Sequence, residues 1–111
     1  MELDAAWLSV VRRCFEEERV LYSGHARREM LEEEFGRILD SEVHEAVCSG
    51  EVIETYPTDS PYPSALILGS TAAGRPIHVV CAHDDADDRA VVITVYEPDA
   101  HRWEKYRRRK Q

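Results

Sequence analysis

The 111-residue chain lacks any apolar run near the roughly 20 residues that a membrane-spanning helix needs. Its first ten residues, MELDAAWLSV, are acidic and have no cleavable signal pattern, so we expect a cytoplasmic protein with no membrane partner. Hydrophobic residues make up 43% of the chain, which is close to globular usage and argues against disorder over the full length. We therefore expect a single domain over residues 1–111 with one hydrophobic core.

Cysteine is scarce, and no two cysteines are close enough to form a CxxC pair. This absence argues against a zinc ribbon and against a redox dithiol. We expect three reduced, mostly buried thiols, which are Cys14, Cys48 and Cys81.

A metal site is not indicated either. His78, Cys81 and His83 are close in sequence, but alternate residues of a strand face opposite ways, so His78 points away from the other two. The acidic stretch 84–88 lacks the residue order of a calcium loop. GxSxG, a glycine-rich phosphate loop and a cysteine with an obvious histidine partner are also missing, so we expect no metal and no cofactor.

Positive charge is concentrated in one place. The chain has 14 Lys+Arg and 22 Asp+Glu, a net charge of −8. Residues 102–111 hold six basic side chains and one acidic side chain, so they carry +5 and the rest of the chain carries −13. Such an acidic body excludes nucleic-acid binding over the whole surface. Any RNA contact must be local, and the basic tail 107–111 is the concentrated patch, although such runs are also typical of a solvated chain end.

Apolar spacing predicts helices in the first half of the chain. Residues 4–18 form an amphipathic pattern with Asp4 as a cap, and a second helical pattern covers residues 25–34. A third short helix is expected from a cap at Ser41 to a stop at Gly50.

From residue 51 the apolar spacing changes to that of strands, and a closing helix carrying Trp103 and Tyr106 is expected after Pro98. In the last strand, alternation predicts that Val91, Ile93 and Val95 face the core, with Val92, Thr94 and Tyr96 opposite. Helices followed by an antiparallel meander predict an α+β fold, with N-terminal helices packed on a four-stranded antiparallel meander. The predicted strands cover residues 51–56, 64–68, 76–82 and 90–96.

A set of imidazole, guanidinium and phenol groups is left without an obvious structural partner. His25 and Arg28 lie one helical turn apart, and His78 and Tyr96 lie on strands that can neighbour each other. Such groups suit RNA phosphodiester transfer, which needs a base, an acid and a cation for the phosphorane. Each also has a plain alternative: His25 as a helix cap, His78 as a hydrogen-bonded strand histidine, and Tyr96 as a core or rim aromatic.

Several segments resemble a small bacterial family of domains of unknown function, family 4258, over residues 22–103. They are SGHARREM at 23–30, GEVIETYP at 50–57, GRPIHVV at 74–80 and ITVY at 93–96. The resemblance groups the chain with the RelE/BrnT-like toxins and implies a RelE-like architecture. It also implies an mRNA-cleaving or ribosome-dependent toxin, neutralised by a cognate antitoxin protein that sometimes carries a zinc-finger segment. His25, His78, Thr94 and Tyr96 match the family's pattern.

The first hypothesis is a toxin-like, metal-independent ribonuclease of a type II toxin–antitoxin pair. His25 or His78 acts as base and acid, Tyr96 orients the phosphate or donates a proton, and Arg28 and Thr94 bind the substrate. The alternative is a non-catalytic protein-interaction module of the same fold, because an acidic surface suits a basic partner better than RNA.

Overall fold

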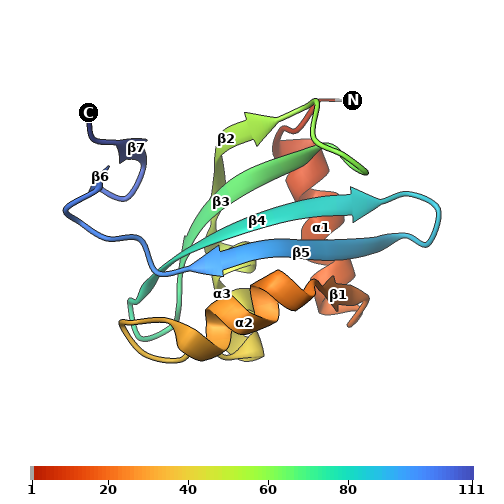
Figure 1. Ribbon diagram of the computed structural model, residues 1–111. Helices are drawn as coiled ribbons and strands as arrows, with labels where there is room; N and C mark the ends of the chain where they lie inside the picture. Colours follow the sequence, from red (N-terminus) through yellow and green to blue (C-terminus); the bar gives the residue numbers. More distant parts are fainter. Residues whose placement is uncertain (1) are drawn as a thin grey trace.

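The helices precede most of the strands, and the predicted α+β class is confirmed. The computed structural model describes residues 2–111, in which the helices pack on one face of a five-stranded sheet (Figure 1). No helix among these residues is long and apolar enough to cross a bilayer. The elements are α1 (Ala5–Glu16), β1 (Val20–Tyr22), α2 (Gly24–Glu32), α3 (Asp40–Ser49), β2 (Glu51–Tyr56), β3 (Ser64–Ser70), β4 (Pro76–Asp84), β5 (Arg89–Tyr96), β6 (Trp103–Glu104) and β7 (Arg108–Arg109).

The helix starts follow from their capping groups. The Asp4 carboxylate accepts hydrogen bonds from the N–H groups of Ala6 and Trp7, both at 3.1 Å, so the predicted cap of α1 is confirmed. The predicted cap of α3 at Ser41 is wrong, because the helix begins at Asp40. There the N–H of Leu39 donates to the Glu42 carboxylate at 2.9 Å, and a carboxylate satisfies the helix start in place of the serine hydroxyl.

The sheet has the order β1-β5-β4-β3-β2. Strands β2 to β5 form the expected antiparallel meander, but the expectation of four strands, all antiparallel, is wrong. Residues 20–22 add a fifth strand, β1, which runs parallel to β5 with Val20 opposite Ala90. Three residues between two helices are too few to show an alternating pattern, and β1 exists through its hydrogen bonds with β5.

A β-bulge changes the inward face of β5. Val80 lies opposite Thr94 but Cys81 lies opposite Val92, so Ile93 is an extra residue in the ladder. Ala90, Val92 and Val95 are fully buried in the helix-side core, and Val91 and Ile93 are half-buried. The predicted core position is therefore right for Val95 and wrong for Val91 and Ile93. One extra residue reverses the alternation, and a run of valine and isoleucine gives no sign of where this happens.

Helix α3 lies directly on β3 at Gly69. A Cβ atom on Gly69 would lie 1.8 Å from the carbonyl oxygen of Ala46, so a larger residue has no room there. This contact brings the helix backbone against the sheet and helps to place the core between the helices and one face of the sheet. No helix formed by residues 2–111 covers the opposite face.

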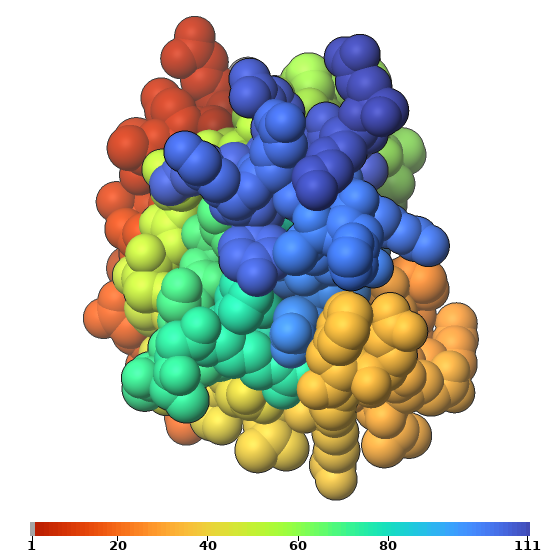
Figure 2. Space-filling view, turned by 90° about the vertical axis from the view of Figure 1, so that its left-hand side faces the viewer, coloured from red at the N-terminus to blue at the C-terminus, as the bar shows by residue number. Residues whose placement is uncertain are grey.

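The predicted closing helix after Pro98 is wrong. The chain forms instead a small antiparallel hairpin, β6–β7, in which Trp103 lies opposite Arg109. Lys105 and Tyr106 have φ angles of +51° and +62° and make the turn. Trp103 is only 5% exposed, and its burial beside the sheet overrides the local helical pattern. We call residues 103–109 the C-terminal hairpin; together with the end of the chain it covers much of the face seen in Figure 2.

Candidate functional site

His78 lies on the helix-free face of the sheet, beneath the C-terminal hairpin. On β4, Ile77, Val79 and Cys81 join the core under the helices, whereas His78 points to the other side, as the strand alternation predicts. The His78 side chain is fully buried. In the sheet register it lies opposite Tyr96, so the structure brings these two predicted residues together.

Both nitrogens of the His78 imidazole have hydrogen-bond partners. Nε2 lies 2.6 Å from the carbonyl oxygen of Tyr106, and Nδ1 lies 3.1 Å from the hydroxyl of Tyr96. Because a carbonyl can only accept, Nε2 carries the proton, and Nδ1 accepts from the Tyr96 hydroxyl. The ring also packs edge-on against Trp103, with 4.5 Å between ring centroids. These contacts fix the tautomer and the orientation of the imidazole.

Burial sets the protonation of this pair. It lowers the pKa of His78 against the opposing influence of the Tyr106 carbonyl, so the imidazole is neutral near pH 7. Burial also raises the pKa of the Tyr96 phenol, which therefore keeps its proton. The pair consists of a neutral phenol that donates to a neutral imidazole.

A second polar group lies next to this pair, on β2. The Glu54 carboxylate accepts from the Tyr56 hydroxyl at 2.7 Å and from the Arg109 guanidinium at 3.2 Å. Burial alone raises the pKa of Glu54, but the hydrogen bonds from Tyr56 and Arg109 bring it below its usual value. Burial, followed by the bond to Glu54, raises the pKa of Tyr56 to about 12. The guanidinium of Arg109 also lies 4.6 Å from the centre of the Trp103 ring.

Sequence reasoning missed Glu54, Tyr56 and Arg109. Glu54 and Tyr56 are two residues apart on a predicted strand, and period 2 puts both on one face. The sequence signal that could have identified Glu54 and Tyr56 is their position within the family-like stretch 50–57. Nothing in the sequence indicated that Arg109, 55 residues after Glu54, pairs with it, because the closing segment was expected to be helical.

His25 lies at the edge of β5 rather than on the sheet face. Its Nε2 is 3.2 Å from the Glu29 carboxylate on the next turn of α2, and its side chain is 59% exposed. Glu29 also accepts from the backbone N–H of Val95 at 3.0 Å, and Glu33 accepts from that of Glu97 at 2.8 Å. The carboxylates of Glu29, on α2, and of Glu33, directly after it, thus accept hydrogen bonds from the edge of β5 beyond the end of β1.

The two predicted substrate-binding residues lie on different elements. Arg28 is exposed on α2, and Thr94 is half-buried on β5 opposite Val80. Among residues 2–111, no hydrogen bond or ion pair joins His25 or Arg28 to His78. The structure therefore brings His78 and Tyr96 into contact, with Thr94 on the same strand as Tyr96. His25 and Arg28 lie on α2 and do not join this pair.

Tyr96 lines an open hollow of about 670 Å³. The C-terminal segment contributes Arg102, Trp103, Arg109 and Lys110 to its wall, and carboxylates come from the residues that follow α2 and from those that follow β5. A volume of this size falls in the range of small-ligand sites. Tyr96, whose hydroxyl is hydrogen-bonded to His78, thus lines a hollow with charged groups of both signs.

A cysteine, a histidine and an aspartate also meet, outside this face. Ligand atoms of Cys14, His83 and Asp88 lie within 4.8 Å of one another. The Asp88 carboxylate already accepts from the guanidinium groups of Arg13 and Arg19 and from His83. The hydrogen bonds from Arg13 and His83, followed by the charges of Arg13 and Arg19, lower its pKa. Burial raises the pKa of the Cys14 thiol. Two guanidinium groups neutralise the carboxylate, so we describe this cluster as a junction between α1 and the β4–β5 turn.

Comparison with known proteins gives one match. The model of a family described as "Domain of unknown function (DUF4258)" matches residues 22–97, more than half of the chain. Searches of curated proteins and of solved structures return no match. The matched residues include His25, Glu54, His78 and Tyr96 and end before the C-terminal hairpin.

Proposed function

Because the chain belongs to the DUF4258 family, whose description leaves the activity open, we propose a function from the site itself. We propose that the protein is a metal-independent endoribonuclease of RelE-like architecture, acting on mRNA in the cytoplasm as the toxin of a toxin–antitoxin pair. The observation that carries the proposal is the position of Tyr96. Its hydroxyl is hydrogen-bonded to the buried His78, and its side chain lines a hollow shared with Arg109 and Lys110.

The proposed reaction is a transphosphorylation. The ribose 2′-oxygen attacks the neighbouring phosphorus and the bond to the 5′-oxygen breaks, which leaves a 2′,3′-cyclic phosphate and a 5′-hydroxyl end. The proton of the 2′-hydroxyl passes to the Tyr96 oxygen while the phenol proton passes to Nδ1 of His78. Protonated His25 gives a proton to the leaving 5′-oxygen. Each such proton transfer contributes roughly 10²–10⁴-fold to the rate.

The remaining roles follow from exposure and charge. His78 does not touch the substrate in this arrangement and acts through Tyr96, so it is a positioning residue and proton acceptor. The charge of Glu54 favours the charged form of His78, which the proposed step produces, and the charge of Arg109 opposes it. Arg28, on α2, and Thr94, on β5, hold the phosphate in this proposal.

The test is to produce the protein in a bacterial host and to map new RNA 5′ ends. We expect new 5′-hydroxyl ends with the wild type and their loss with Tyr96→Phe and with His25→Ala. Tyr62→Phe is the matched control, because Tyr62 lies in the β2–β3 loop away from the site. Purified protein is then incubated with a defined mRNA, with and without ribosomes and with EDTA. Unchanged cleavage in both site variants would refute the assignment.

The second candidate, a non-catalytic interaction module, is favoured by a different observation. Leu31, Phe35 and Leu39 are 64%, 49% and 48% exposed, and they lie within nine residues that run from the end of α2 through its connection to α3. Acidic residues adjoin them in the sequence, among them Glu32 and Glu34. Exposed apolar side chains among carboxylates suit a partner that offers apolar and basic groups, such as the proposed antitoxin.

Co-expression with the neighbouring gene product tests this second candidate. A stable complex that Phe35→Ala and Leu39→Ala weaken, together with no RNA cleavage by the free protein, supports an interaction module. Leu21→Ala is the control, because Leu21 is 45% exposed on β1. A complex that the control weakens equally contradicts this choice of surface.

A further inference from the structure

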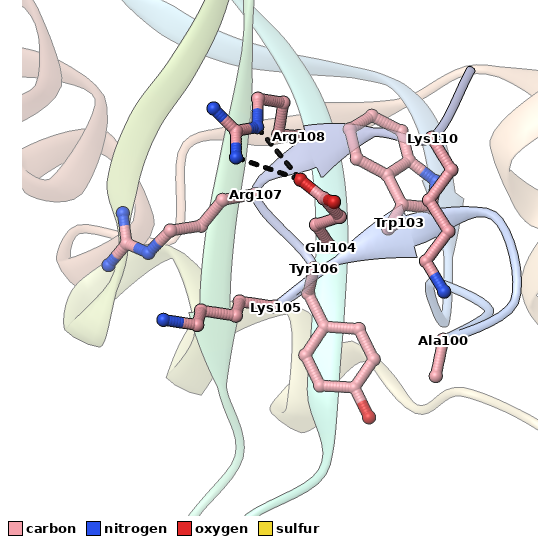
Figure 3. Close-up of a pocket in the computed structure, with 8 residues that line it drawn as sticks. All are labelled: Ala100, Trp103, Glu104, Lys105, Tyr106, Arg107, Arg108 and Lys110. Carbon is pink, nitrogen blue, oxygen red and sulfur yellow. Dashed lines mark hydrogen bonds and ion pairs between the residues drawn. The ribbon is translucent and has the colours of Figure 1, made fainter.

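The C-terminal hairpin lines a second open pocket, which shares Trp103 and Lys110 with the hollow beside Tyr96. Its volume is about 810 Å³, and residues 100–110 supply the whole lining (Figure 3). This size suits a nucleotide-sized ligand. The pocket lies beyond the residues matched by the family model.

The lining is basic in a protein that is otherwise acidic. It contains Lys105, Arg107, Arg108 and Lys110 and one carboxylate, that of Glu104. Arg107 pairs with Glu51 and Arg108 pairs with Glu104. The two lysines have no acidic partner within 4.0 Å among residues 2–111, so they are available to an anion. At physiological salt, charges farther away than about 8 Å are largely screened, and the acidic body does not cancel this local field.

Aromatic groups stand among these cations. Trp103 forms an apolar wall of the pocket, and Tyr106 presents its ring to it with the ammonium groups of Lys105 and Lys110 on either side (Figure 3). Tyr106 is half-buried, so part of this residue is exposed to solvent. Phosphate-binding cations interleaved with aromatic rings are the combination that binds single-stranded nucleic acid.

The turn that displays these side chains has an unfavourable backbone. Lys105 and Tyr106 both have positive φ, where glycine or asparagine is usual, and the N–H of Arg107 closes the turn on the carbonyl of Glu104 at 2.9 Å. Contacts outside the hairpin hold it in place, above all the bond from His78 to the Tyr106 carbonyl. Strained residues held by their surroundings are often found at binding sites.

We infer that this pocket is a subsite for single-stranded RNA, in which Lys105 and Lys110 bind backbone phosphate and the Tyr106 ring stacks on a base. The inference rests on the proposed function, because it names the strand that the Tyr96 site cuts. The hydrogen bond between His78 and the Tyr106 carbonyl connects this subsite to the Tyr96 site. An RNA strand bound on the hairpin therefore lies beside the sheet face that carries Tyr96.

The experiment measures binding of a fluorescently labelled eight-nucleotide RNA by anisotropy across a salt series. The Tyr96→Phe background prevents cleavage during the measurement. We expect the double variant Lys105→Ala/Lys110→Ala to bind about tenfold or more weakly and to show a smaller salt dependence, because two phosphate contacts are lost. Tyr106→Leu keeps the charge and is expected to bind about fivefold or more weakly through lost stacking.

The matched control is Arg37→Glu, which changes the net charge by the same two units at an exposed position on the α2–α3 connection. Equal loss of binding in this control, or no loss in the lysine variant, overturns the inference. Equal binding of single-stranded DNA of the same sequence overturns the assignment to RNA, and displacement of the RNA by an acidic peptide overturns the assignment to nucleic acid. If RNA binding depends on the two lysines but the wild type does not cleave RNA, the proposed function is wrong and the RNA subsite is still supported.

Discussion

His78 and Tyr106 fix each other across 28 residues of chain: Nε2 of the buried imidazole lies 2.6 Å from the Tyr106 carbonyl. The same imidazole accepts from Tyr96 through Nδ1, so a single ring connects the sheet face to the hairpin turn. The hairpin therefore depends on the tautomer and the charge of His78. The first prediction follows from this dependence.

Stability should fall as the pH decreases through the range in which a free histidine titrates. Burial lowers the pKa of His78 in the folded protein, so near and below pH 6.5 the unfolded chain binds a proton that the folded chain does not. The free energy of unfolding is then highest above about pH 7 and decreases toward the lower folded-state pKa. Urea denaturation at several pH values measures this slope.

The control for the pH prediction is His78→Phe, which keeps a ring under Trp103 but cannot titrate. We expect this variant to lose part of the slope between about pH 7 and pH 5.5, where carboxylates contribute little. An unchanged slope would show that His78 does not cause the effect.

Gly69→Ala should destabilise the fold strongly. The added methyl group would lie 1.8 Å from the Ala46 carbonyl oxygen, so α3 must move off β3. Overpacking of this kind costs about 1–3 kcal/mol or more. Gly24→Ala is the control, because its Cβ meets only the end of the Arg28 side chain at 3.6 Å. Thermal melts of both variants give the comparison, and a similar small change in each would contradict the close approach.

Glu29→Ala should expose the edge of β5. The carboxylate accepts from the N–H of Val95, and without it that amide has only water as a partner. We expect faster hydrogen exchange at Val95 with little change at residues paired to β4. Glu32→Ala, one turn along on the exposed side of α2, is the control. Unchanged exchange at Val95 would mean that the carboxylate does not protect this edge.

Val92→Ala should cost more stability than Val91→Ala. The bulge places Val92 in the core with no exposed surface and leaves Val91 half-buried. Truncating a fully buried valine costs about 2 kcal/mol, and a half-buried one costs less. Chemical denaturation of the two variants tests the inward face of β5. The reverse order would support the uninterrupted alternation that the sequence suggests.

The parts that sequence reasoning predicted well depend on local patterns. The Asp4 cap follows from a local capping residue. The first three helices, the meander and the opposite directions of His78 and Cys81 follow from periods of 3.6 and 2. The parts it missed depend on distant contacts. Residues 20–22 become a strand because β5 lies beside them, and residues 103–109 form a hairpin because Trp103 is buried beside His78.

In the candidate site, too, contacts between neighbouring strands could be predicted and contacts with distant segments could not. The pairing of His78 with Tyr96 could be expected because both lie on neighbouring strands of a meander. The Glu54–Arg109 pair could not, because it needs the position of a segment whose local pattern indicated a helix. Likewise, the hydrogen bond of Glu29 to the β5 edge needs the direction of α2 relative to the sheet, which apolar spacing does not give.

The carboxylates along α2 also limit how this sheet can grow. Since Glu29 and Glu33 occupy the β5 edge beyond β1, and β1 has only three residues, β2 is the one long strand with an open edge among residues 2–111. Glu51 and Glu54 bring charge to that strand, and charged side chains discourage pairing between copies. Among residues 2–111, a strand donated by another chain therefore has one long edge to pair with, that of β2, and only the three-residue edge of β1 on the other side of the sheet.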